Sequence, residues 1–213
     1  MGSVTGKRLP RLTPEVIDTE QAALREAIVG GDRGTQTQHF PLTDDDGALH
    51  GPFGIMLNAP AVGDALQRLG ATIRFRTDLS ARIREIAILH TAHATGSRFE
   101  WWAHARVARA VGLTDEEIMQ LSIGCFDSED VQESATAALC RCLLTSGVVT
   151  DDEFTAARAH LSHRQITELT TLVGYYRLLT ELMTVYDVGV PDDDPSTHVH
   201  HCGHGPTEHL EAS

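Results

Sequence analysis

The sequence has few basic residues for its size, and this shortage excludes several classes of partner. Its 213 residues carry 17 Lys and Arg against 30 Asp and Glu, which gives a formal net charge of −13. A surface this acidic repels a phosphate backbone and an anionic lipid surface alike. We therefore expect no nucleic acid partner and no membrane partner.

Long apolar runs are also lacking. No stretch approaches the roughly 20 apolar residues that a membrane-spanning helix needs. The first ten residues hold no apolar segment of the kind found in a secretion signal. We expect a soluble, cytoplasmic protein.

Cysteine is scarce, and no nucleotide-binding loop is present. The four cysteines, Cys125, Cys140, Cys142 and Cys202, are too few and too irregularly spaced for a disulfide framework, so reduced thiols are expected. The glycines at 30, 31 and 34 lack the spacing and the preceding strand of a dinucleotide fingerprint. The sequence thus predicts no nucleotide cofactor.

What is present is helical periodicity along nearly the whole chain. The apolar pattern and the cap residues predict helices over residues 14–29, 60–75, 81–95, 98–111, 115–123, 129–146, 151–161 and 163–187. The clearest starts are three capping boxes, Thr114 to Glu117, Thr150 to Glu153 and Ser162 to Gln165. No β-strand is indicated, so we predict an all-α fold, a single domain of about seven to eight helices.

Three regions differ in composition. Residues 1–49 hold the first helix, begun by Thr13 and Pro14, and part of a Pro- and Gly-rich connection over 31–58 in which regular structure is not expected. Residues 50–190 form the helical domain. Residues 191–213 form a tail with five of the twelve histidines and Cys202, which is either a chain end without a role or a metal-handling module.

The residues best suited to chemistry lie on the helical hairpin of residues 81–111. Glu100 and His104 are four apart and share one helix face, and Glu85 on the antiparallel partner can reach toward His104. A carboxylate beside an imidazole handles protons. The same spacing also fits an ordinary surface ion pair, whereas Trp101 and Trp102 favour a pocket.

A metal site on the hairpin is the weaker interpretation. His90 and His93 could join His104 as imidazole ligands. The hairpin has no His-Glu-x-x-His motif, and Glu100 with His104 is one residue too long for the Glu-x-x-His of di-iron bundles. We expect no metal in the domain.

Three segments in the same order resemble the carboxymuconolactone decarboxylase family. They are Leu79-Ser80-Ala81-Arg82-Ile83-Arg84-Glu85, Phe99-Glu100-Trp101-Trp102-Ala103-His104 and Gly112-Leu113-Thr114-Asp115-Glu116-Glu117-Ile118. Supporting pieces, Gly51-Pro52-Phe53, Asn58-Ala59-Pro60, Glu168 and Leu172-Val173-Gly174-Tyr175-Tyr176, extend the resemblance over roughly residues 50–190. The resemblance implies the helical fold of alkylhydroperoxidase D-like proteins, a homotrimer or hexamer, and a role in aromatic catabolism.

One departure separates the branches of this family. The peroxidase branch carries a Cys-x-x-Cys pair before the histidine, and those two positions are Ser97 and Glu100 in this sequence. A thiol peroxidase needs a low-pKa thiolate with a resolving cysteine close by. The resemblance therefore implies the other branch, a decarboxylase without cofactor.

The implied reaction assigns roles to the hairpin residues. The substrate would be a small unsaturated lactone or keto carboxylate, with His104 as the proton carrier, Glu85 orienting it and Glu100 setting its charge state. Phe53, Trp101 and Tyr175 would line the pocket. A local cation must offset the acidic surroundings, and among Arg82, Arg84, Arg98 and Arg106 we assign Arg106 to the substrate.

Two alternatives remain open from the sequence. The same residues would serve another cofactorless lyase or an isomerase acting on an unsaturated carbonyl compound. The chain could also be a non-catalytic oligomeric binding protein that kept the fold.

Overall fold

The computed structural model describes residues 8–31, 37 and 39–190. This part of the chain is helical, and its strand-like pairing amounts to one isolated bridge between Thr43 and Leu49. The helices are α1 (Thr19–Val29), α3 (Gly51–Met56), α4 (Pro60–Phe75), α5 (Ala81–Thr95), α6 (Arg98–Ala110), α7 (Asp115–Ser122), α8 (Val131–Thr145), α9 (Asp151–Arg158) and α10 (His163–Tyr186). The prediction of a single all-α domain is confirmed.

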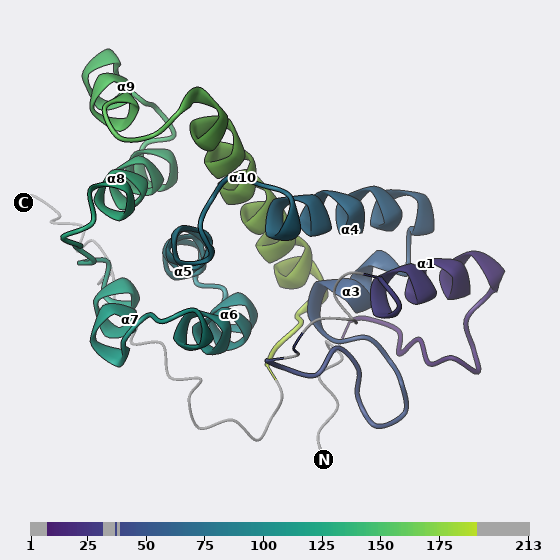
Figure 1. The fold of residues 1–213 in the computed structure, drawn as a ribbon. Coiled ribbons are helices and arrows are strands. Elements are labelled where there is room, and N and C mark those ends of the chain that lie inside the picture. The colour runs from purple at the N-terminus through teal and green to yellow at the C-terminus, as the bar shows by residue number, and fades with distance from the viewer. Residues whose placement is uncertain (1–7, 32–36, 38, 191–213) are drawn as a thin grey trace, which may run out of the picture.

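Helix α5 lies at the centre of the fold. It contacts α6, α7, α8 and α10, which surround it, while α1, α3 and α4 pack together on the other side of α10 (Figure 1). Nine of its fifteen residues are buried, among them Glu85, His90 and Thr91. Polar side chains in such a position need partners, because an unpaired buried polar group costs free energy.

A tight turn joins α5 to α6 as the sequence predicts. Gly96 ends α5 in the left-handed conformation at φ 66°, where a side chain would be strained. Ser97 then begins α6, and its Oγ accepts a hydrogen bond from the backbone N–H of Glu100. The hairpin places the start of α6 against the end of α5.

The three predicted capping boxes are all present. Thr114, Thr150 and Ser162 each accept a hydrogen bond from the backbone of the residue three positions later, whose side chain accepts one in return. The starts of α7, α9 and α10 are therefore set by local hydrogen bonding.

The first helix was predicted to begin too early. Residues 14–16 form a turn, with the N–H of Val16 donating to the carbonyl of Thr13, and α1 starts at Thr19. Its N-terminus is capped by Asp18, which forms a capping box with Gln21. The capping box at Asp18 therefore sets the start of α1, rather than the Thr13-Pro14 pair.

The prediction of no regular structure over residues 31–58 is also wrong in part. Residues 51–56 form α3, and all six of these residues are buried. Gly51 has φ +57°, and a Cβ there would collide with the ring of Phe99. Tertiary contacts, rather than local propensity, hold this Gly- and Pro-containing turn in a helix.

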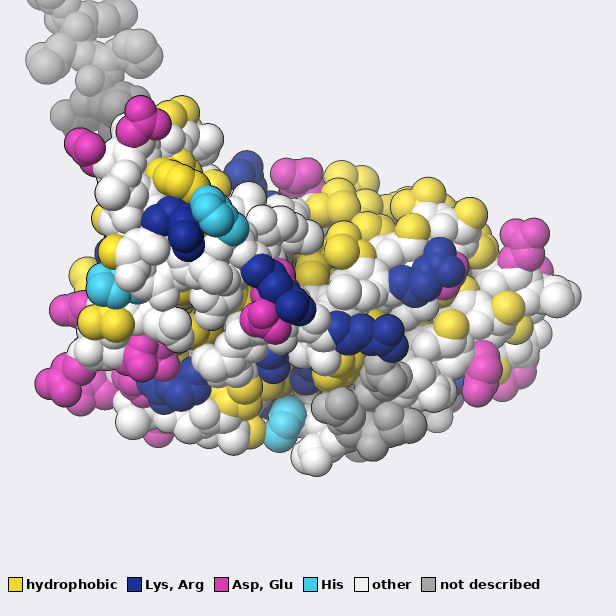
Figure 2. All heavy atoms as spheres, turned by 45° about the horizontal axis from the view of Figure 1, so that its top comes forward, with side chains coloured by type: hydrophobic (Ala, Val, Ile, Leu, Met, Phe, Trp, Pro, Cys, Tyr) yellow, Lys and Arg dark blue, Asp and Glu magenta, His cyan; other side chains and the backbone are white. Residues whose placement is uncertain are grey.

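The buried apolar side chains form two clusters. The larger one includes Trp102 and lies among α3, α5, α8 and α10, and the smaller one includes Trp101 and lies between α5, α6 and α7. On the outside, acidic side chains gather toward the two ends of the face shown in Figure 2, and basic ones run across its middle. No helix in the described ranges is long and apolar enough to cross a membrane.

Candidate active site

A buried carboxylate–imidazole pair joins the two helices of the hairpin. Nδ1 of His104 on α6 lies 2.7 Å from Oε2 of Glu85 on α5. His104 is 4% exposed and Glu85 is 3% exposed. At this distance the ring donates its Nδ1 proton to the carboxylate, which leaves Nε2 as the nitrogen that faces other groups.

Two further side chains face Nε2 of His104. The hydroxyl of Tyr176 on α10 lies 3.2 Å from this nitrogen, and its ring stands edge-on to the imidazole with the centroids 5.1 Å apart. Oε2 of Glu100, one turn earlier on α6, lies 3.5 Å from it. The imidazole is therefore held by one carboxylate at Nδ1 and approached by a phenol and a second carboxylate at Nε2.

The pKa of Tyr176 is raised well above its usual value. Burial is the largest cause, and the negative charges of Glu100 and Glu85 add to it, while Arg74 acts in the opposite direction. The phenol consequently stays neutral at physiological pH. It can donate to a neutral Nε2 or accept from a protonated one.

A narrow cavity is lined by His104. It is small, with a cavity volume of about 30 Å³. Its lining residues come from five separate parts of the chain and are Phe40, Pro52, Phe53, Arg74, Phe99, Glu100, Ala103, His104, Tyr175, Tyr176 and Leu179. The walls are largely aromatic and aliphatic, with one imidazole, one carboxylate, one guanidinium and the tyrosine hydroxyls.

The structure brings five of the seven predicted site residues together. Glu100, His104, Phe53 and Tyr175 line the cavity, and Glu85 contacts His104 from behind. Trp101 is instead buried in the apolar cluster between α6 and α7. It lies about 100° further around α6 than Glu100, which turns its indole away.

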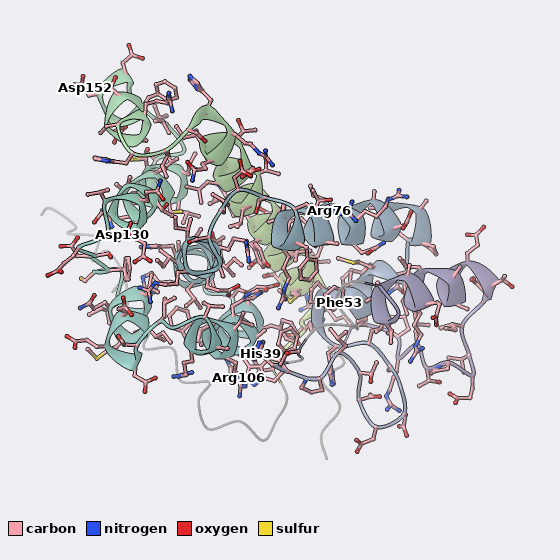
Figure 3. All side chains as sticks on the ribbon, in the orientation of Figure 1. His39, Phe53, Arg76, Arg106, Asp130 and Asp152 are labelled. Carbon is pink, nitrogen blue, oxygen red and sulfur yellow. The ribbon has the colours of Figure 1, made fainter. Side chains whose placement is uncertain are left out.

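Arg106 also lies away from the cavity. Its guanidinium stacks on the ring of Trp102 at 4.7 Å from the centroid and donates to the Trp102 carbonyl. Figure 3 shows Arg106 near the outer side of α6, whereas Phe53, on α3, lies next to α10. The stacking on Trp102 accounts for this arginine without a ligand.

The other arginines considered from the sequence have structural partners or lie elsewhere. Arg82 binds Glu117 at 2.6 Å and Glu133 at 2.7 Å. Arg84 donates to the carbonyl of Leu79, and the exposed Arg98 lines a separate groove near the end of α10. The cation in the cavity is Arg74, on the last turn of α4.

Sequence reasoning missed two site residues, Tyr176 and Arg74. Tyr176 stands in a segment that resembles the family, next to the chosen Tyr175, but which of two adjacent side chains faces His104 depends on how α10 packs. Arg74 belongs to no motif and reaches the site through the crossing of α4 with α10. The local sequence alone therefore assigns neither side chain to the cavity.

The thiols of Cys125, Cys140 and Cys142 and the remaining hairpin histidines lie outside the cavity. Cys140 is fully buried, and burial raises the pKa of its thiol to about 12. His90 packs edge-on against Phe126, and His93 lies against Gly124. Within the described ranges no three metal-ligating side chains come together, and the His-rich tail lies outside those ranges.

Comparison with known proteins supports the resemblance found in the sequence. Residues 60–139 match the model of the carboxymuconolactone decarboxylase family. This segment includes α5, α6 and the Glu85–His104 pair. No curated protein matches the chain.

Solved structures share the fold at low identity. An alkylhydroperoxidase AhpD core protein from Ralstonia eutropha JMP134, an uncharacterized peroxidase-related protein, has 14% identity and a TM-score of 0.70 over 90% of this chain and 95% of its own. The debrominase Bmp8 has 13% identity and a TM-score of 0.66 over 87% of this chain and 93% of its own. A protein of unknown function from Agrobacterium tumefaciens has 20% identity and a TM-score of 0.59 over 66% of this chain and 98% of its own. The fold is thus AhpD-like.

Proposed function

The chain carries a carboxymuconolactone decarboxylase family segment at residues 60–139, and from this premise we propose that it is a cofactor-independent decarboxylase. The substrate is a small unsaturated lactone or keto carboxylate of the 4-carboxymuconolactone kind. The observation that carries the proposal is the Glu85–His104 pair at 2.7 Å, buried behind a cavity with aromatic walls.

The reaction requires one proton and no external electrons. The bond between the carboxylate carbon and the ring carbon breaks, carbon dioxide leaves, and the electron pair passes into the conjugated carbonyl as an enolate. Nε2 of His104 then gives a proton to carbon, forming the new C–H bond, and the imidazole recovers a proton from water. The products are carbon dioxide and the lactone that carries the new C–H bond.

Glu85 prepares His104 for this step. Its carboxylate accepts the Nδ1 proton, fixes the ring orientation, and stabilises the charged imidazolium. Tyr176 accepts from Nε2–H while the ring is charged and donates to Nε2 once the proton has gone, because its hydroxyl stays neutral. Glu85 and Tyr176 are positioning residues in this scheme.

Glu100 favours the loss of carbon dioxide. Its carboxylate lines the cavity 3.5 Å from Nε2. A substrate carboxylate placed beside it is repelled, and this repulsion ends when the group leaves as neutral carbon dioxide. Like charges at short range in a partly buried cavity interact more strongly than in water.

We also propose that the chain forms a homo-oligomer. Helix α4 exposes 61% of Val62 and 38% of Leu69. Hydrophobic side chains gather in Figure 2 over the half of the molecule that holds α1, α3 and α4. Exposed apolar patches are a mark of interaction surfaces, and the molar mass in solution tests this proposal.

The decarboxylase is tested with purified protein dialysed against a chelator and given 4-carboxymuconolactone. We expect release of carbon dioxide, its loss in His104→Ala, and no loss in His160→Ala, a control at an exposed histidine. A folded wild-type protein that releases no carbon dioxide would refute the decarboxylase. The proposal would then pass to an isomerase or another lyase on an unsaturated carbonyl compound.

A further inference from the structure

One arginine differs from the others in how its charge is accommodated. The half-buried arginines in the described part of the chain are Arg25, Arg74, Arg82, Arg84, Arg106 and Arg158. All but Arg74 donate a hydrogen bond to a protein oxygen, namely those of Gly47, Glu133, Leu79, Trp102 and Leu161. Arg74 donates to no described residue, and its guanidinium lies 5.6 Å from the ring centroid of Phe75.

This arginine lies in the wall of the catalytic cavity. It comes from the last turn of α4, whereas His104 comes from α6 and Tyr176 from α10. The surface between these polar groups is supplied by Phe40, Phe53 and other apolar side chains. A guanidinium in such surroundings gains more from an anion than it would in water, because fewer solvent dipoles screen the interaction.

A second positive charge lies close to Arg74. Burial lowers the pKa of Arg84, Glu85 raises it, and the charge of Arg74 lowers it again. Two guanidinium groups that repel each other at a half-buried site are stabilised when an anion is bound between or beside them. The carboxylate of Glu85 is not the hydrogen-bond partner of Arg74, since it is bound to His104.

We propose that Arg74 is the specificity-determining residue of the cavity and binds the carboxylate that the substrate keeps. The inference rests on the proposed function for the identity of the reaction. A cation on the departing carboxylate would hold the electron pair that must move into the ring, and so would oppose the loss of carbon dioxide. Arg74 and Glu100, which both line the cavity, therefore orient a substrate with two anionic groups, with the retained carboxylate toward the arginine.

The test measures binding without turnover. The probes are 5-oxotetrahydrofuran-2-acetate, a saturated lactone that bears one carboxylate and cannot decarboxylate through an enolate, and its uncharged methyl ester. Titration calorimetry of the wild type is expected to show the acid binding about tenfold more tightly than the ester. In Arg74→Leu this preference disappears, and in Arg74→Lys part of it returns.

The control is Arg68→Leu, which removes the same charge from the same helix. Arg68 is exposed and pairs with Asp64 at 2.9 Å, so the preference for the acid should stay as in the wild type. Circular dichroism and a melting curve establish that each variant is folded. The inference would be overturned by any of three results. The preference for the acid could be unchanged in folded Arg74→Leu, it could be lost equally in Arg68→Leu, or the acid could fail to bind the wild type at about 10 mM.

This design separates the two proposals. In one outcome the acid binds in an Arg74-dependent way, but no carbon dioxide is released from 4-carboxymuconolactone. The anion site would then stand, and the decarboxylase proposal would be rejected. In the other outcome carbon dioxide is released, but the preference for the acid over the ester is the same in Arg74→Leu as in the wild type. The decarboxylase would then stand, and the anion site would be rejected.

Discussion

Oε2 of Glu85 lies 2.7 Å from Nδ1 of His104, and the two residues come from adjacent antiparallel helices joined by a turn at Gly96. Both are at least 96% buried. Neither could be left alone in this interior, because breaking a buried pair leaves an uncompensated charge or polar group. The pair therefore holds the hairpin together and also fixes which imidazole nitrogen faces the cavity.

Replacing Glu85 by Gln should reduce turnover while the protein remains folded. The amide still accepts a hydrogen bond from Nδ1–H but carries no negative charge to stabilise the imidazolium. We expect kcat to fall by about 100-fold or more with a smaller change in KM. Steady-state kinetics measure this, with Glu181→Gln on the exposed face of α10 as the control; a kcat within twofold of the wild type contradicts the assigned role.

Tyr176→Phe should change how stability depends on alkaline pH. The phenol has a raised pKa in the folded protein, so the unfolded chain loses this proton first. The stabilisation is complete below the unfolded pKa of about 10 and decreases as pH rises above it. Urea unfolding at pH 8 and pH 10.5 should show a smaller decrease in Tyr176→Phe than in the wild type.

The same substitution also removes the hydrogen bond to Nε2 of His104. We expect a loss of about 1 kcal/mol at pH 8. Equal alkaline slopes for the two proteins would mean that this phenol titrates as in the unfolded chain.

His90 should make the protein sensitive to acid. Burial, with Arg141 and His93 acting in the same direction, lowers its pKa to about 4. The unfolded chain binds the proton at about pH 6.5 and the folded protein does not, so stability is complete above pH 6.5 and decreases as pH falls toward 4. The total loss is about 3 kcal/mol.

His90→Phe removes this titration and places an apolar ring beside Phe126. We expect the difference in the free energy of unfolding between pH 7 and pH 4.5 to be smaller in the variant than in the wild type. Urea titrations at both pH values measure it. An identical acid slope would show that His90 contributes nothing to it.

Arg82→Ala should destabilise the fold by about 2 to 4 kcal/mol. The guanidinium joins α5 to α7 and α8 through Glu117 and Glu133, and the Glu133 side chain is 8% exposed. The matched control is Arg109→Ala, because its partner Asp115 is 83% exposed and such pairs contribute about 1 kcal/mol or less. Equal losses in urea unfolding would contradict the structural role given to Arg82.

Local signals in the sequence predict much of the fold and much of the site. The caps at Ser80, Thr114, Thr150 and Ser162 are local hydrogen-bonding patterns, and they place four helix starts correctly. The 19-residue spacing from Glu85 to His104, across one tight turn, brings the two side chains together without long-range information. For this reason the pair could be predicted.

The remaining parts depend on how distant segments pack. The helix α3 forms because its six residues are buried among other elements, and its Gly and Pro content argues against it locally. Tyr176 and Arg74 reach the cavity through the packing of α10 and α4. Trp101 was assigned to the pocket from its neighbours in sequence, and a rotation of about 100° on the helix takes it to a different cluster.

The measurement that tests the account most directly is decarboxylation of 4-carboxymuconolactone in D2O, with carbon dioxide and product analysed together. The wild type should release one carbon dioxide for each deuterium incorporated into the lactone product at carbon, and His104→Ala should do neither at a measurable rate. Release of carbon dioxide by folded His104→Ala at the wild-type rate would contradict the account.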